Sequence, residues 1–177
     1  MIEKTSARQL LVEQILTNKQ RQQATHATGL AKAQHDKRFD HLAEIAGSVF
    51  EAPVSQVTLL GDKTQWFKSS LGFPLEEAPT NTSFCAHTIS VYNLPLVVPD
   101  TMADRFFSKN PFVVNPPHIR FYAGYPIWFQ EEKVGTVCVY DFEPRTHITD
   151  EQIEVIKQIS EQASTLLKLV VQQKNLD

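Results

Sequence analysis

Two stretches that follow each other in the chain, residues 117–126 and 135–141, constrain the fold most, because each reads as a strand that is apolar on both faces. One face of the first strand carries, at the two-residue period of a strand, Ile119, Phe121, Ala123, Tyr125 and Ile127. Its other face carries Arg120, Tyr122, Gly124 and Trp128. In the second strand Val137 and Val139 point one way, and the opposite face carries Val134, Cys138, Tyr140 and Phe142. Since a sheet with one solvated face alternates apolar and polar residues, we expect a sheet covered on both sides, with the functional site under its second cover.

The rest of the chain supplies helices for one cover and an irregular segment for the other. The predicted elements are, in order, helices at residues 6–35 and 38–50, a hairpin at 54–60 and 65–70, an irregular proline-rich segment at 71–118, the two strands above, and a helix at 149–173. Within the irregular segment we expect a helical turn near 83–91, a strand at 95–98 and a helix after Asp100. Thr149 and Gln152 have the spacing of a capping box at the start of the last helix. This order predicts an α+β fold with an antiparallel sheet, helices from both ends of the chain on one face and an irregular lid on the other.

We divide the chain into a helical N-terminal extension, residues 1–37, and a main domain, residues 38–177. Residues 18–37 are almost all polar, so this part of the extension is expected to project from the core or to pair weakly. The apolar stripe of the last helix is wider than contact with one sheet requires. That surplus, together with the N-terminal helix, favours a helical bundle with a second subunit, a homodimer. The alternative is that both helices pack within one chain.

Composition excludes several classes of partner and location. A net charge of −3 gives no basic face for nucleic acid. No run of about 18 apolar residues is present, so no membrane-spanning helix is expected, and the N-terminus lacks the apolar region of a signal peptide. Two cysteines, Cys85 and Cys138, are too few for a disulfide framework and suit a reducing compartment. We therefore expect a cytoplasmic protein.

Several stretches together resemble a GAF domain, a relative of the PAS fold. They are residues 57–60 (VTLL), 65–68 (QWFK), 83–89 (SFCAHTI), 95–100 (PLVVPD), 120–124 (RFYAG) and 135–141 (GTVCVYD). The resemblance covers residues 38–173 and is greatest to the GAF domains that precede bacterial histidine kinases and diguanylate cyclases. It implies a six-stranded antiparallel sheet, terminal helices that dimerise, and a ligand cavity between the sheet and residues 72–118.

The resemblance does not identify a ligand or cofactor. GAF domains bind cyclic nucleotides, linear tetrapyrroles, haem, amino acids or small acids. The asparagine-lysine pattern of cyclic-nucleotide binders and the Asp-Ile-Pro motif of bilin binders are not found in this sequence. The chain ends soon after its last helix, so we expect a sensor of this kind to signal through a separate protein.

Eight residues are candidates for the lining of that cavity, since small-ligand pockets combine an apolar wall with a few polar groups. They are Trp66, Phe84, Cys85, His87, Asp100, His118, Arg120 and Tyr122. Arg120 has the planar fork that binds a carboxylate or phosphate with two hydrogen bonds. The alternative is that Arg120 pairs with Asp100 or Asp141 to tie the lid to the sheet, and that the aromatic rings fill the cavity as core.

Thiol chemistry is a second hypothesis. Cys85 and His87 lie two apart, and a nucleophilic cysteine requires a base or a cation that lowers its pKa. The spacing of the cysteines and histidines matches no recognised zinc-ligand pair, so no metal site and no catalytic residue are predicted. The leading prediction is a non-enzymatic sensory GAF protein that binds a small molecule and signals through a helical dimer interface. The alternatives are a thiol-based redox enzyme or sensor that uses Cys85, and a ligand-free dimerisation module.

Overall fold

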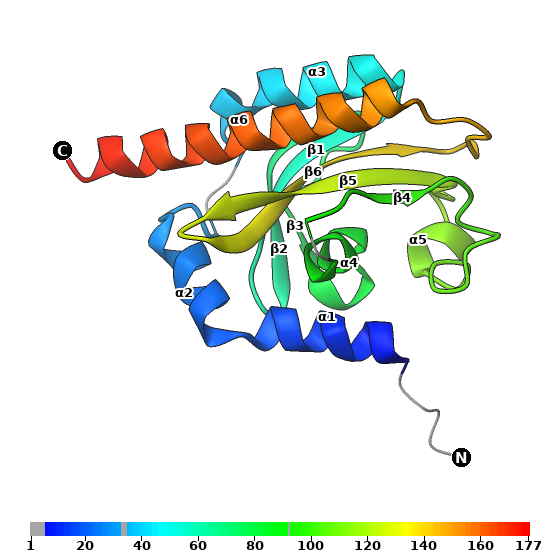
Figure 1. Ribbon diagram of the computed structural model, residues 1–177, viewed down its shortest axis with the longest axis horizontal. Helices are drawn as coiled ribbons and strands as arrows, with labels where there is room; N and C mark the ends of the chain where they lie inside the picture. Colours follow the sequence, from blue (N-terminus) through cyan, green and yellow to red (C-terminus); the bar gives the residue numbers. More distant parts are fainter. Residues whose placement is uncertain (1–5, 33–34, 92) are drawn as a thin grey trace.

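The computed structural model of the protein describes residues 6–32, 35–91 and 93–177. These residues fold around one antiparallel sheet with strands of different lengths (Figure 1). Its strands are β1 (Val54–Leu60), β2 (Thr64–Leu71), β3 (Glu77–Pro79), β4 (Leu96–Val98), β5 (Phe121–Phe129) and β6 (Glu132–Asp141). They form a 6-stranded sheet in the order β3-β2-β1-β6-β5-β4, and each neighbouring pair is antiparallel. This confirms the six-stranded antiparallel sheet and the α+β class.

Two helices, α3 (Asp40–Phe50) and α6 (Asp150–Lys174), cover one face of the sheet (Figure 1). A 3₁₀ turn at Lys37–Phe39 precedes α3. The capping box at the start of α6 is confirmed, since Thr149 Oγ1 accepts from the Gln152 backbone N–H at 3.1 Å and Gln152 Oε1 accepts from that of Thr149 at 3.0 Å. The buried stripe of α6 comprises Ile156, Ile159, Ser160, Ala163, Leu167 and Val170. This stripe and the apolar side of α3 pack on the sheet to form the helix-face core.

The prediction that the strands now identified as β5 and β6 are covered on both faces is confirmed, with two corrections. Val134 packs in the helix-face core with Val137, because a bulge between Ile127 and Trp128 shifts the strand register. Ile119 packs in the second core, on the opposite face from Phe121. It precedes β5, and the backbone turns at His118, whose φ is +57°, so the strand period does not extend to it.

The second face is covered by a lid that contains a 3₁₀ turn (Thr80–Thr82), α4 (Phe84–Ser90) and α5 (Pro111–Val114). The helix expected after Asp100 is wrong, since that segment forms turns up to Asn110. The physical reason is competition from aspartate side chains. Asp100 accepts from the backbone N–H of Met102, and Asp104 accepts from those of Phe106 and Phe107, which fixes turns in place of helix.

The N-terminal segment differs most from expectation. The single helix predicted at 6–35 is wrong, because the extended residue Asn18 separates two helices, α1 (Ala7–Thr17) and α2 (Lys19–Ala27). The side chain of Asn18 caps α2 by accepting a hydrogen bond from the Arg21 backbone N–H. Val12 and Leu16 of α1 join the core beneath α4, so α1 lies on the lid side (Figure 1). The prediction of helices from both ends of the chain on one face is therefore confirmed for α3 and α6, whereas α1 lies on the opposite face. The first five residues of the predicted extension, and residues 33 and 34, lie outside the described residues.

The polar segment after Asn18 does not project into solvent, which corrects a second expectation. Arg21 is 0% exposed and donates to the carbonyl oxygens of Leu60 and Gly61 at 2.8 and 2.9 Å, and to that of Ile15 at 2.7 Å. These bonds hold α2 across the end of β1. The described residues contain no helix that is both long and apolar enough to cross a bilayer.

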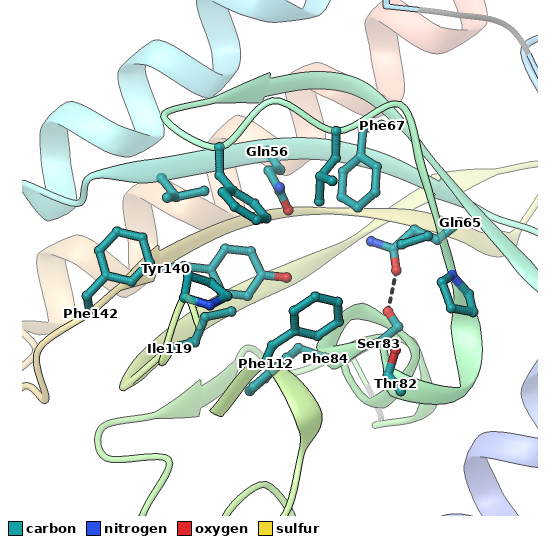
Figure 2. Close-up of a pocket in the computed structure, with 16 residues that line it drawn as sticks. Gln56, Gln65, Phe67, Thr82, Ser83, Phe84, Phe112, Ile119, Tyr140 and Phe142 are labelled. Carbon is teal, nitrogen blue, oxygen red and sulfur yellow. Dashed lines mark hydrogen bonds between the residues drawn. The ribbon is translucent and has the colours of Figure 1, made fainter. Parts of the chain in front are cut away.

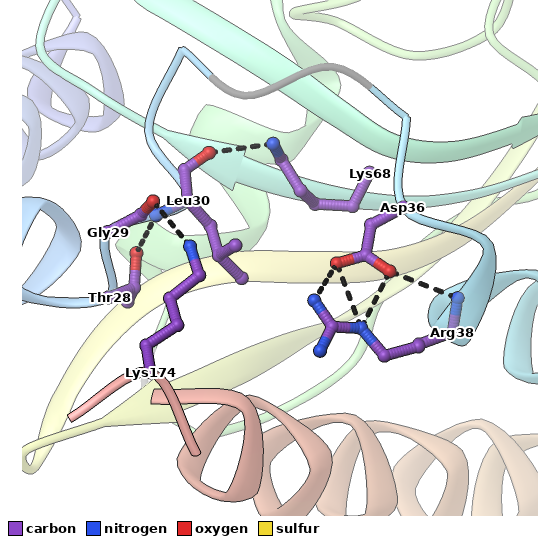
Figure 3. A network of polar contacts seen from close by, with 7 residues as sticks. All are labelled: Thr28, Gly29, Leu30, Asp36, Arg38, Lys68 and Lys174. Carbon is purple, nitrogen blue, oxygen red and sulfur yellow. Dashed lines mark hydrogen bonds and ion pairs between the residues drawn. The ribbon is translucent and has the colours of Figure 1, made fainter. Parts of the chain in front are cut away.

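Two lysines fix the connection that follows α2 (Figure 3). The carbonyl oxygen of Leu30 accepts from Lys68 Nζ on β2 at 2.7 Å, and that of Gly29 accepts from Lys174 Nζ, at the end of α6, at 3.1 Å. The N-terminal segment is thus attached to both the sheet and the last helix.

Candidate functional site

A cavity of about 50 Å³ lies between the sheet and the lid, as the resemblance implies (Figure 2). Most of its wall is apolar, and comprises Val54, Phe67, Phe73, Leu75, Ala78, Pro79, Phe84, Phe112, Pro117, Ile119 and Phe142. The polar groups on the wall are those of Gln56, Gln65, Thr82, Ser83 and Tyr140. An apolar wall with a few polar groups is the usual character of a small-molecule site.

Ser83 connects the lid to the sheet at this cavity. Its hydroxyl donates to Gln65 Oε1 on β2, and the same oxygen caps α4 by accepting from the Ala86 backbone N–H at 3.2 Å (Figure 2). Gln56 on β1 donates through Nε2 to Ser70 Oγ at 2.9 Å. The two glutamines therefore come from adjacent strands, and one of them positions the start of the lid helix.

Aromatic rings close the inner end of the cavity. Phe84 stacks on Phe107 with ring centroids 4.3 Å apart and meets the edge of Tyr140 at 5.8 Å. Tyr122 lies 5.2 Å from Phe84, is 0% exposed, and its hydroxyl lies 2.5 Å from Thr88 Oγ1 on α4. Much of the space between lid and sheet is thus filled by the protein's own side chains.

Two thiols meet behind these rings. Cys85 on α4 and Cys138 on β6 are both fully buried, and their Sγ atoms are 3.8 Å apart. The hydroxyls of Tyr122 and Tyr140 each lie 3.8 Å from Cys85 Sγ. Burial acts to raise the pKa of the Cys85 thiol, but hydrogen bonds from Cys138, Thr136 and the two tyrosines outweigh it and lower that pKa to about 6. Burial and the neighbouring Cys85 raise the pKa of Cys138 well above its ordinary value.

The structure brings together three of the eight predicted site residues, Phe84, Cys85 and Tyr122, and Phe84 alone of the eight lines the cavity. Trp66 lies on the opposite face of the sheet, in the helix-face core. His87 points to the other side of α4, where its ring is 4.8 Å from that of Phe107. Burial, assisted by the charge of Arg8, lowers the pKa of His87 to about 4.

The other three predicted residues lie outside the cavity wall, His118 and Arg120 beside α5 and Asp100 in the turn that follows β4. Arg120 Nη1 donates to the carbonyl oxygens of Val113 at 3.0 Å and Ile119 at 3.2 Å, and His118 Nδ1 is 3.2 Å from the same Val113 oxygen. Asp141 is paired with Arg145 at 2.7 Å. The alternative that Arg120 ties the lid to the sheet through Asp100 or Asp141 is therefore corrected: it does so through backbone carbonyls.

Sequence reasoning missed Gln56, Gln65 and Ser83. No local signal distinguished the glutamines, because the same strands carry other polar residues, among them Ser55, Thr58 and Ser69. A second and wider hollow, of about 650 Å³, lies between α1 and the lid and was also missed. Its wall includes His87, Phe106, Lys63 and Lys109.

Comparison with known proteins agrees with this geometry. The model of the GAF domain family matches residues 34–167. A cyclic di-GMP phosphodiesterase of Pseudomonas aeruginosa is 33% identical over 138 residues, which are 77% of this chain and 23% of that protein. The chain thus spans about a quarter of the length of that curated relative.

Solved structures share the fold at low sequence identity. The GAF domain of an Acinetobacter phosphoenolpyruvate-protein phosphotransferase has a TM-score of 0.61 and 11% identity, and the match covers 92% of this chain and 94% of that one. The GAF-B domain of DevS from Mycobacterium smegmatis has a TM-score of 0.58 and 14% identity, over 78% of this chain and 96% of that one. A free methionine-R-sulfoxide reductase from Neisseria meningitidis has a TM-score of 0.60 and 12% identity, over 94% and 90%. With its six-stranded sheet, its lid and the match over residues 34–167, this chain belongs to the GAF domain family.

Proposed function

We propose that this protein is a sensor that binds a small organic molecule in the cavity between the sheet and the lid. Membership of the GAF family makes it a sensory or regulatory domain. The observation that carries the ligand proposal is the cavity itself, with its apolar wall and the polar side chains of Gln56, Gln65, Ser83 and Tyr140. Those groups suit a mainly apolar ligand with one or two hydrogen-bonding atoms.

The size of the cavity relates binding to a change of shape. A cavity of about 150 Å³ is what accommodates benzene in a protein core, whereas this one measures about 50 Å³. It has room for water or a very small molecule as it stands, and a larger ligand must displace the lid. A ligand shifts a conformational equilibrium only through its different affinities for the two states. A cavity that fits the ligand only when the lid has moved supplies that difference.

Strand β6 gives the ligand a route to the helices. Tyr140 lines the cavity, and the adjacent Val139 belongs to the helix-face core beneath α3 and α6. On β1, Gln56 and Val57 divide the two faces in the same way. A shift of β1 or β6 under the lid therefore changes how α6 packs on the sheet.

We further propose that α6 passes this shift to a second copy of the chain. Leu169 is 56% exposed and Leu166 is half-buried on the outer side of α6, with Thr165 and Gln162 beside them. An exposed leucine next to a half-buried one on a long capped helix supports a helix-to-helix dimer contact.

Similarity to the Pseudomonas phosphodiesterase supports a role in cyclic di-GMP signalling. In this proposal the domain regulates an enzyme that makes or degrades that nucleotide, whether the enzyme is joined to it or separate. A cytoplasmic location is proposed with it, because Cys85 and Cys138 are free thiols. Replacing the matched 138-residue segment of the phosphodiesterase by this chain tests the role. The proposed regulatory role is contradicted if the phosphodiesterase activity of the chimera no longer responds to the signal that regulates the parent enzyme.

Ligand binding is tested by native mass spectrometry of the purified protein, followed by thermal-shift screening of amino acids, small aromatic and aliphatic acids, and nucleotides. A ligand at 100 times its Kd adds about 2.7 kcal/mol, which raises the Tm by roughly 5–10 °C in a domain of this size. Ala78→Leu fills the cavity and is expected to abolish the response, whereas Ala103→Leu, at an exposed site outside the cavity wall, is expected to retain it. No response in the wild type, or an equal response in Ala78→Leu, contradicts the proposal.

A further inference from the structure

The two cysteines of the chain lie in contact across the boundary between the lid and the sheet. Cys85 belongs to α4 and Cys138 to β6, 53 residues later in the chain, and their Sγ atoms are 3.8 Å apart. A disulfide has an S–S length of about 2.05 Å, so the two sulfur atoms need to approach by less than 2 Å, a distance that side-chain rotation and a small shift of α4 supply. Neither thiol has any solvent exposure.

We infer that Cys85 and Cys138 are a redox-active pair, which hydrogen peroxide converts to an intramolecular disulfide that fastens the lid helix α4 to strand β6. This inference does not depend on the proposed ligand. It does extend the family assignment, because it adds an oxidation site that joins the movable cover of the fold to its sheet.

The cavity wall lies one side chain away from each thiol, so a small oxidant in the cavity reaches the thiols when a wall side chain moves. Cys138 Sγ lies 3.8 Å from Gln56 Oε1, and Cys85 Sγ lies 3.8 Å from the Tyr140 hydroxyl. Gln56 and Tyr140 both line the cavity of about 50 Å³. Because about 10–15 Å³ of such space holds one water, the cavity admits hydrogen peroxide, which is little larger than water.

The surroundings assign different roles to the two thiols. Cys85 has two tyrosine hydroxyls and the Cys138 thiol within 3.8 Å, so its thiolate has donors that stabilise the negative charge. Cys138 has Cys85 and the acceptor oxygen of Gln56 as neighbours. Cys85 is therefore the attacking thiol and Cys138 the resolving one.

The reaction proceeds in two balanced steps. The Cys85 thiolate attacks one peroxide oxygen, so an S–O bond forms, the O–O bond breaks and the other oxygen leaves as water after taking up a proton, which gives a sulfenic acid. The Cys138 thiol then attacks the Cys85 sulfur, so the S–S bond forms, the S–O bond breaks, and the departing hydroxide takes up the Cys138 proton and leaves as a second water. Two thiols supply two electrons, and one peroxide is reduced to two waters.

The bond has a consequence for the lid that rests on the proposed function. Phe84, which lines the cavity, precedes Cys85 directly, and Tyr140 lies two residues after Cys138 on the same face. A disulfide therefore holds the two sides of the cavity together. Any ligand that requires α4 to move away from β6 binds the oxidised protein more weakly.

The test uses the reduced 177-residue chain. The folded chain is treated with hydrogen peroxide, unfolded in N-ethylmaleimide, and weighed by mass spectrometry. The expected product is a monomer that has lost two hydrogen atoms and takes up no maleimide, and that regains both thiols after dithiothreitol. The disulfide closes a long loop of the unfolded chain, so oxidation is expected to raise the Tm by roughly 5–15 °C.

Two matched variants separate the pair from general oxidation. Cys138→Ser is expected to accumulate a sulfenic acid at Cys85 that dimedone traps, and Cys85→Ser is expected to show neither trapping nor a disulfide. Circular dichroism verifies that both variants are folded. The inference is overturned if the folded wild type keeps two alkylatable thiols at a peroxide dose that oxidises free glutathione, or if it gains oxygen at each cysteine without losing hydrogen. These readouts need no ligand, so their failure is distinct from failure of the sensor proposal.

Discussion

Replacing Arg21 by methionine tests whether the N-terminal segment is part of the folded domain. Arg21→Met keeps most of the aliphatic stem and removes the guanidinium. That group makes four hydrogen bonds, to the carbonyl oxygens of Ile15, Leu16, Leu60 and Gly61. All four acceptors then lose a charged donor, at a site that is 0% exposed.

The expected magnitude follows from opposing effects. Hydrogen bonds from a charged donor contribute about 1.5–3 kcal/mol each, although they do not add when one group makes all of them. Burial lowers the pKa of Arg21 to about 10, so the charge is incompletely compensated, and removing it recovers some desolvation free energy. The net loss is expected to be about 3–5 kcal/mol of unfolding free energy, which lowers the Tm by roughly 6–20 °C.

Urea denaturation of the wild type and variant measures this difference, and Arg38→Met is the matched control. Arg38 pairs with Asp36 at 2.6 Å on a side chain that is 41% exposed (Figure 3), so its loss is expected to cost less than about 1 kcal/mol. Equal costs for the two substitutions would refute the reasoning, because the buried guanidinium would then contribute no more than a surface ion pair.

Three further predictions concern the sheet, the lid and the helix surface. Gly135→Ala places a Cβ 1.9 Å from the carbonyl oxygen of Thr58, so the backbone of β6 must shift and the unfolding free energy is expected to fall by about 1–3 kcal/mol in urea. His87 has a folded pKa of about 4, below its unfolded value, so its contribution to the unfolding free energy is present above pH 6.5 and is lost as the pH falls toward 4. His87→Gln is expected to make the unfolding free energy depend less on pH between about 6.5 and 4. Identical slopes for the wild type and the variant would contradict this prediction. Leu169→Asp is expected to give a monomer in light scattering while Lys168→Asp stays dimeric, and an unchanged Leu169→Asp dimer excludes α6 as the interface.

The parts of the fold that could be predicted are those that local pattern determines. The capping box of α6 and the two-sided β5–β6 pair appear directly in the sequence and are confirmed. The N-terminal segment could not be predicted in this way. A polar residue such as Arg21 is ordinarily assigned to solvent, and its burial depends on carbonyls at the end of β1 that are 39 and 40 residues away.

The site was predicted less well than the fold, for a related reason. The predicted site consisted mainly of aromatic residues and Arg120, whereas the polar wall of the cavity is formed by Gln56, Gln65 and Ser83, the cap of α4. Strand alternation correctly applied would have separated Trp66 from its neighbours, because Gln65 and Phe67 line the cavity and Trp66 faces the helices. Contact between Cys85 and Cys138 depends on how α4 sits on β6, which no local pattern contains.

The position of α1 determines whether α4 or α5 can be displaced from the sheet. α4 is enclosed, since it lies between the sheet and α1 and its Ser83 cap is bonded to β2. α5 faces α1 across the wide hollow, on whose wall Pro111 lies; it is four residues long and carries Val114 with 50% exposure. Its attachments to the start of β5 are the bonds that Arg120 and the Ile119 N–H make with the carbonyl oxygens of Val113 and Phe112. Because Phe112 also lines the cavity, the sensor proposal predicts that a ligand enters by displacing α5, and that Arg120 affects this opening without touching the ligand.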